Sequence, residues 1–204
     1  MKIVLATHNR HKVEEIRQIL FDMDVELLSL DNFPFIGEIV EDGTTLEENA
    51  RKKSGTVFNL IRNKVPGSDH YLSLADDTGL EVDALSGRPG VYSARYSGEK
   101  ATYAQNNEKL LHELEGVPPE MRTAVFRCAI SIIGENVDEL AIGEVPGRIL
   151  LATRGRNGFG YDPLFVPDGY DQTYAEMDYE LKNRLSHRAL ALAEARKVLI
   201  RLSR

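Results

Sequence analysis

A short apolar strand that leads directly into an amphipathic helix constrains the fold of this chain more than any other feature. The run Lys2–Ala6 is rich in β-branched and aliphatic residues, which is typical of a buried strand. The apolar residues between Val13 and Leu20 then recur at spacings of three and four, as on the buried face of a helix. A strand followed at once by a helix predicts a sheet that is covered by helices.

Further strands and helices follow along the chain. Thr45 and Glu48 have the spacing of a capping box and predict a helix that continues to Ile61. Residues 71–75 are typical of a strand, which we expect to end where two aspartates follow. Another helix is expected around Asn106 to Leu114, because its leucines share one face.

The second half of the chain favours paired strands. Residues 123–133 and 139–150 are strand-like runs, and the segment 134–136 between them suits a hairpin. Ser186 is expected to cap a final helix. Strands and helices alternate early and strands pair late, so we predict an α/β fold with a mixed sheet flanked by helices. No linker or repeat divides the chain, and residues 1–204 are predicted to form a single domain.

Charge and composition exclude several classes of protein. The 25 Lys and Arg against 32 Asp and Glu give a net charge of -7, the wrong sign for a protein that coats nucleic acid. No apolar run approaches the ~18 residues that span a bilayer. The lone cysteine, Cys128, lies in an apolar run and is predicted to be buried. A cytoplasmic protein without nucleic-acid or membrane partners is therefore expected.

The loop between the first strand and the first helix is a candidate phosphate site. Helix N-termini attract anions through free N–H groups and the positive end of the dipole, and Thr7, Asn9 and Lys12 could add donors. The alternative is an ordinary polar turn with a capping asparagine. The glycines of a Walker A loop or a dinucleotide fingerprint are absent.

Two acidic clusters, Glu41-Asp42-Gly43 and Asp76-Asp77-Thr78, are candidate ligands for Mg²⁺. This ion usually takes one or two carboxylates and completes its shell with water and substrate phosphate oxygens. The alternative is that these acids are solvated turn or cap residues. The metal interpretation gains from a phosphate loop on a neighbouring strand, because ligands collect beyond the strand ends of α/β sheets.

Two later segments could contact a planar anionic ligand. The glycines in Asn157–Pro163 flank Phe159, whose ring could lie against a base, although such aromatics also fill cores. Lys182 and the pair His187-Arg188 offer cationic donors near a helix start, where the alternative is solvated surface. The histidines lack the spacing of a zinc site, and no nucleophilic triad is evident.

Taken together and in order, these motifs resemble the inosine/xanthosine triphosphate pyrophosphatase family, nearly end to end. The matching segments are Ala6–Asn9 with Lys12, Glu41–Gly43 with Glu48–Ala50, Ala75–Leu80, Gly90–Tyr96, Gly158–Pro163 and Ser186–Arg188. The resemblance implies an elongated mixed sheet in two lobes with a central nucleotide-binding cleft, and a homodimer as the usual assembly. It also implies Mg²⁺-dependent hydrolysis of non-canonical purine nucleoside triphosphates (ITP, dITP, XTP) to monophosphate and pyrophosphate, which prevents their incorporation into DNA and RNA.

The resemblance also assigns roles to single residues. It makes Asp77 the proton acceptor and a Mg²⁺ ligand, and Glu41 a second metal ligand. Phe159 would stack on the base, while Lys12 and Lys53 would hold the triphosphate. The substrate-binding residues that it implies are Thr7, His8, Asn9, Arg10, His11, Lys12, Lys53, Thr78, Phe159, Gly160, Tyr161, Asp162, Lys182, His187 and Arg188. His8 stands where many members carry glycine, and Thr78 replaces a serine while it keeps the hydroxyl.

Two other functions compete with this interpretation. A pyrophosphatase for pyrimidine or methylated nucleotides would share the general cleft but need other base contacts. A regulatory module would bind a nucleotide without hydrolysis, and the intact acids Glu41, Asp76 and Asp77 argue against it.

Overall fold

The computed structural model describes residues 1–203 of the chain. Contacts divide them into two compact units. Unit 1 comprises residues 1–77, 128–143 and the last helix from residue 190, and unit 2 comprises residues 78–127 and 144–189. Each unit has its own buried apolar cluster. That the whole chain forms one domain stays a prediction.

The strands form one mixed sheet. They are β1 (Lys2–Leu5), β2 (Glu26–Ser29), β3 (Tyr71–Val82), β4 (Pro89–Gly90), β5 (Thr123–Gly134), β6 (Val137–Ile149) and β7 (Phe165–Pro167). Their order is β2-β1-β3-β5-β6-β7, and β4 pairs with β3 beside this path. β1 is parallel to β2 and β3, whereas β4 and β7 are antiparallel to β3 and β6. The predicted mixed α/β sheet is confirmed.

The helix caps predicted at Thr45 and Ser186 are confirmed. The helices are α1 (Arg10–Ile19), α2 (Leu46–Lys64), α3 (Tyr103–Glu113), α4 (Tyr179–Leu185) and α5 (His187–Leu202). The Thr45 hydroxyl accepts from the Glu48 N–H at 3.1 Å, and the Ser186 hydroxyl accepts from the Ala189 N–H at 3.2 Å. The Glu48 carboxylate accepts from the Thr44 N–H rather than from that of Thr45, so the second half of the capping box is shifted by one residue.

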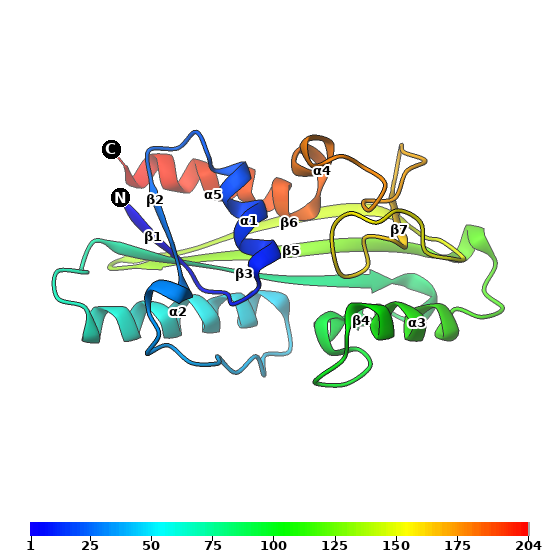
Figure 1. Ribbon diagram of the computed structural model, residues 1–204, viewed down its shortest axis with the longest axis horizontal. Coiled ribbons are helices and arrows are strands. Elements are labelled where there is room, and N and C mark those ends of the chain that lie inside the picture. The colour runs from blue at the N-terminus through cyan, green and yellow to red at the C-terminus, as the bar shows by residue number, and fades with distance from the viewer. Residues whose placement is uncertain (204) are drawn as a thin grey trace. The chain divides into compact units, whose positions relative to one another are not determined.

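The core of unit 1 has two halves, one on each face of its strands. Ile3 and Leu5 pack in one cluster with apolar residues of α1 and α5. Val4 packs in the other with Val57 and Ile61 of α2. Successive residues of a strand point to opposite faces, so a continuous apolar run serves both halves. Figure 1 shows α2 and α5 on opposite sides of these strands.

The core of unit 2 is built around aromatic rings. Phe126 on β5 lies 4.9 Å from the ring of Phe165 and 6.1 Å from that of Tyr174, measured between centroids. Leu110 and Leu114, from α3 and the residue after it, are fully buried in the same cluster. The apolar face predicted for this helix is thus confirmed.

Strand β3 is longer than the sequence predicts. We expected it to end at Asp76, but it continues through Asp77 to Val82. Leu80 and Val82 are fully buried, and Leu80 and its neighbour pair with β4. The prediction was wrong because adjacent acids were treated as a strand end, whereas both are buried here. Four short elements, β2, β4, β7 and α4, were not predicted, since 2 to 7 residues carry too little periodicity.

Two local predictions are confirmed. β5 and β6 are neighbours joined by Glu135 and Asn136, and Asn136 has a φ of 61°, a left-handed conformation that asparagine tolerates. Cys128 is fully buried on β5. Within the described residues, no helix is long and apolar enough to cross a membrane.

Candidate active site

The two aspartates of β3 lie just past the point where its parallel neighbour β1 ends. β1 pairs with β3 as far as Leu5 opposite Leu74, and the Ala6 N–H still donates to the Leu74 carbonyl at 2.7 Å. Asp76 and Asp77 follow and are 1% and 6% exposed. The two acids therefore lie beyond a strand end, as expected for a ligand site in an α/β sheet. The strand that ends is β1, however, and the acids belong to β3.

The side chains of Asp76 and Asp77 point to opposite faces of β3, because neighbouring strand residues alternate. Asp76 Oδ1 lies 3.1 Å from the ammonium nitrogen of Lys12 on α1. Asp77 Oδ1 lies 2.8 Å from that of Lys53 on α2, which is also 3.2 Å from Glu41 Oε1. We call these five residues the acid–lysine cluster. All belong to unit 1.

Burial and charge act against each other in this cluster. Burial raises the pKa of the Asp77 carboxyl above its ordinary value, Lys53 and Lys12 oppose this, and the Glu41 carboxylate adds to it. Burial alone would lower the pKa of the Lys53 ammonium, but the neighbouring carboxylates, Asp77 foremost, outweigh it and raise that pKa. Lys53 therefore stays protonated, and Asp77 is a stronger proton acceptor than an exposed aspartate once it is ionised.

Asn49 joins the two acidic segments and was not among the predicted site residues. Its Oδ1 accepts from the Gly43 N–H at 2.8 Å, and its Nδ2 donates to Asp77 Oδ2 at 3.4 Å. A Cβ on Gly43 would lie 2.7 Å from Asn49 Oδ1, so only glycine allows this approach. The signal in the sequence is a polar pair, Asn49 and Lys53, one turn apart on the buried face of a helix.

The loop before α1 is an ordinary polar turn with a capping asparagine. Asn9 is the N-cap, and its Oδ1 accepts from the N–H groups of His11 and Lys12 at 3.0 and 3.4 Å. The Thr7 hydroxyl accepts from the Asn9 N–H at 3.1 Å. Lys12 reaches the acids, whereas His8, Arg10 and His11 are exposed. Phosphate binding by this loop stays a prediction.

In unit 2 a buried ion pair fixes the predicted aromatic loop. The Lys182 ammonium donates to Asp162 Oδ2 at 2.7 Å, and both side chains are about 95% buried. The same oxygen accepts from the Phe159 N–H at 2.8 Å. Gly158 has a φ of 71°, and a Cβ there would lie 2.0 Å from Asp162 Oδ2. The Asp162 carboxylate thus explains both the glycine at 158, which leaves room for it, and the position of Phe159, whose N–H it binds.

The ring of Phe159 lies among cations. The Lys182 ammonium is 5.2 Å and the Arg188 guanidinium 5.6 Å from its centroid, within the range of cation–π attraction. Arg188 is 2% exposed and donates to the Thr78 hydroxyl at 3.1 Å. We call Thr78, Phe159, Asp162, Lys182 and Arg188 the recognition cluster. All five were predicted as site residues, and all lie in unit 2.

The predicted site residues His187 and Tyr161 are held by contacts with other buried residues of unit 2. The His187 ring stacks on Phe126 at 4.3 Å between centroids, with the planes 8° apart. The Tyr161 hydroxyl donates to the Ser93 carbonyl at 2.9 Å, so its ring points inward. These contacts show how the structure holds both residues, and their contact with a ligand stays a prediction.

The carboxylates of the acid–lysine cluster fit a Mg²⁺ ion that shares a ligand shell with phosphate. Glu41 and Asp77 both reach the Lys53 ammonium, so their oxygens already converge on one positive charge. Among residues 1–203, no group of three or more His, Cys, Asp and Glu side chains could hold a metal ion by itself. Mg²⁺ usually takes one or two carboxylates together with waters and phosphate oxygens, and its binding by Glu41 and Asp77 stays a prediction.

The mixed sheet and the two clusters define an α/β protein that pairs buried cations with buried acids in each unit. The sequence pattern of the Ham1 family matches residues 3–198. The chain belongs to the Ham1 family.

Relatives match the chain along almost its whole length. It is 50% identical to the dITP/XTP pyrophosphatase of Geobacter sulfurreducens over 193 residues, 94% of this chain and 93% of that protein. It is 48% identical to the dITP/XTP pyrophosphatase of Desulforamulus reducens, covering 99% and 97% of the two chains. The solved structure of a HAM1 protein from Coxiella burnetii matches with a TM-score of 0.85 and 35% identity, covering 98% and 99%. The family resemblance of the sequence motifs is confirmed.

We predict that Asn49→Asp destabilises the protein by ~2–3 kcal/mol, because it buries a second carboxylate against Asp77 in place of an amide donor. Asn59→Asp is the matched control, since Asn59 is exposed on the same helix and should change the unfolding free energy by no more than ~0.5 kcal/mol. Urea unfolding of both variants measures the difference. Equal unfolding midpoints would contradict the role of the Asn49 amide.

Proposed function

We propose that this chain hydrolyses non-canonical purine nucleoside triphosphates, among them ITP, dITP and XTP, to a nucleoside monophosphate and pyrophosphate. The observation that carries the proposal is Asp77, a buried carboxylate held between Lys53 and Asn49 in a member of the Ham1 family. Relatives about half identical to this chain are named dITP/XTP pyrophosphatases. Removal of such nucleotides would keep them out of DNA and RNA.

In this proposal unit 1 binds the triphosphate. Lys12 and Lys53 supply two ammonium groups, and both are already oriented by carboxylates. Thr7 and Asn9 lie at the start of α1, where the helix dipole adds a positive potential. Mg²⁺ would be held by Glu41 and Asp77, and when bound it supplies charge that neutralises the phosphate oxygens.

The chemical step needs an oriented water and a proton acceptor. Water adds to the α-phosphorus, the bond from that phosphorus to the bridging oxygen breaks, and pyrophosphate leaves with the bonding electron pair. The Asp77 carboxylate takes the proton of the attacking water, and its raised pKa suits this role. Asn49 holds the carboxylate in place through its second oxygen.

Unit 2 recognises the base in this proposal. Phe159 offers a flat face for stacking, but stacking alone cannot separate purines of similar shape. Arg188 is a fixed donor beside that ring, and a 6-oxo base presents an acceptor where adenine presents an amino donor. Asp162 and Lys182 hold the loop that carries the ring. Sites built on such hydrogen bonds reject the mismatched ligand strongly, because buried groups are left unpaired.

A homodimer and a cytoplasmic location belong to the same proposal. The homodimer follows from the family resemblance. The cytoplasmic location is the default for a sequence without an apolar run of membrane-spanning length, and the lone buried cysteine requires no oxidising compartment.

The proposal is tested by measuring pyrophosphate release by the wild-type protein across a nucleotide panel. We expect kcat/KM for ITP, XTP and dITP to exceed that for ATP by at least ~10²-fold, since one donor and acceptor pair is reversed. Pyrimidine and methylated nucleotides should be poorer substrates. Preference for those nucleotides would favour the rival pyrophosphatase class, and tight binding without pyrophosphate would favour the regulatory module.

Chelation of divalent cations should abolish this activity, because the acids Glu41 and Asp77 would otherwise repel a triphosphate. We expect a loss of at least ~10²-fold in excess EDTA and full recovery when Mg²⁺ is restored. Calcium chelation alone, with Mg²⁺ present, serves as the control. Undiminished turnover in EDTA would remove the metal from the proposal.

Asp77→Asn should lower kcat for ITP by ~10²–10⁴-fold, the range for a lost general base, while nucleotide is still bound. Asp168→Asn is the matched control, because Asp168 is exposed and its turnover should stay near that of the wild type. Urea unfolding checks that both variants are folded. Near wild-type turnover of a folded Asp77→Asn would end the catalytic assignment.

A further inference from the structure

Two consecutive asparagines on α3 hold two different loops of unit 2. Asn106 Oδ1 accepts from the Ser97 N–H at 2.8 Å, and its Nδ2 donates to the Ala94 carbonyl at 3.0 Å. Asn107 Nδ2 donates instead to the carbonyl of Gly160 at 3.0 Å. Asn106 thus fixes the turn at residues 93–97, and Asn107 fixes the residue next to Phe159.

The two asparagines differ in how well they are satisfied. Asn106 uses both side-chain atoms, whereas Asn107 Oδ1 is buried and has no hydrogen-bond partner within residues 1–203. A flipped amide would place Oδ1 against the Gly160 carbonyl, so the orientation of Asn107 is set by that contact. A buried acceptor without a partner is destabilising, and stability alone would favour an apolar residue here.

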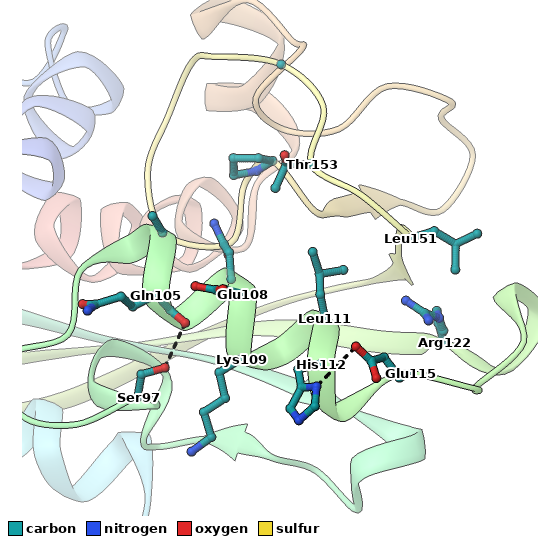
Figure 2. A pocket seen from close by; sticks show the side chains of 14 residues that line it. Ser97, Gln105, Glu108, Lys109, Leu111, His112, Glu115, Arg122, Leu151 and Thr153 are labelled. Atoms are coloured by element: carbon teal, nitrogen blue, oxygen red, sulfur yellow. Dashed lines mark hydrogen bonds and ion pairs between the residues drawn. The ribbon is translucent and has the colours of Figure 1, made fainter.

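Open space borders the loop on the side of α3. A hollow of about 980 Å³ lies beside α3 and is lined by Asn107 and by Gly155 and Pro163 at the two ends of the loop. In Figure 2 the side chains of Leu111 on α3 and Thr153 border this hollow. Space rather than packed side chains adjoins the loop here, so the Asn107 bond adds a tie to α3, while the Asp162–Lys182 pair and the Tyr161 hydroxyl hold the loop elsewhere.

We propose that Asn107 is a positioning residue for base recognition, which acts by tying the Gly160 carbonyl to α3 and so holding Phe159 in place. Tyr103, at the start of the same helix, lies 5.8 Å from the Phe159 ring between centroids. The ring therefore neighbours both α3, through Tyr103, and the cations of Lys182 and Arg188. The inference rests on the proposed function, since it assigns to Asn107 an effect on that same recognition cluster.

Hydrogen exchange and kinetics of Asn107→Leu test the inference. Leucine removes both the donor to Gly160 and the unpartnered acceptor while it keeps the number of side-chain heavy atoms and the branch at Cγ. We expect amides at 157–162 to exchange roughly 3- to 10-fold faster, the effect of one lost hydrogen bond, with the urea midpoint unchanged or higher. KM for ITP should rise by a similar factor, whereas inhibition by pyrophosphate, which has no base, should be unchanged.

Two further variants separate positioning from a merely structural role. Glu108→Gln, on the exposed neighbour, should behave as the wild type in every measurement. Asn106→Leu, which loses satisfied bonds, should lower the urea midpoint. The inference is overturned if Asn107→Leu leaves exchange at 157–162 unchanged, if it lowers the urea midpoint as Asn106→Leu does, or if pyrophosphate inhibition weakens in parallel with ITP.

Failure of the proposed function has a different signature. If the wild-type protein releases no pyrophosphate from ITP, the proposed function and the base-recognition role of Asn107 both fail. Exchange at 157–162 then still decides whether Asn107 positions the loop, because that measurement needs no substrate.

Discussion

The ammonium groups of Lys12 and Lys53, one for each face of β3, allow a strand in the interior of the sheet to carry two consecutive acids. A carboxylate buried without a partner would be strongly destabilising. β3 alternates its side chains, so its acids need one cation on each face, and Lys12 of α1 and Lys53 of α2 provide them. The positions of both helices are thereby coupled to the chemistry of the strand, and Asn49 adds the segment at Gly43 to the same arrangement.

Unit 2 also buries a carboxylate against a lysine ammonium, here on a loop. Asp162 is buried with Lys182, and its oxygen also accepts from the Phe159 N–H. A charged pair that is fully hydrogen-bonded imposes its geometry on the backbone around it. The glycine at 158 is then a consequence, because any Cβ there would occupy the space of the carboxylate. In the proposed function this loop presents the Phe159 ring to a flat ligand, and the Phe126, Phe165 and Tyr174 rings pack in the core of the same unit.

Two buried polar groups in or next to the two clusters are unfavourable for stability. The Asn107 acceptor is buried without a partner in the part of the chain that the structure describes, and Asp77 is buried with a raised pKa. Such features reduce stability, and functional sites are where proteins tolerate them. Asn107 holds the loop that carries Phe159, and Lys53 and Asn49 hold the Asp77 carboxylate. The proposed reaction needs both Phe159 and Asp77.

The sequence by itself determined the alternation of strands and helices, the caps at Thr45 and Ser186, the mixed sheet and the family, since periodicity, cap chemistry and ordered motifs are local properties. It also named the members of both clusters. Only the tertiary structure decided that Asp76 and Asp77 lie within β3 rather than at its end, because the cations that make their burial tolerable come from distant helices. Asn49 and Asn107 became visible for the same reason, since their partners lie 6 to 53 residues away in the chain.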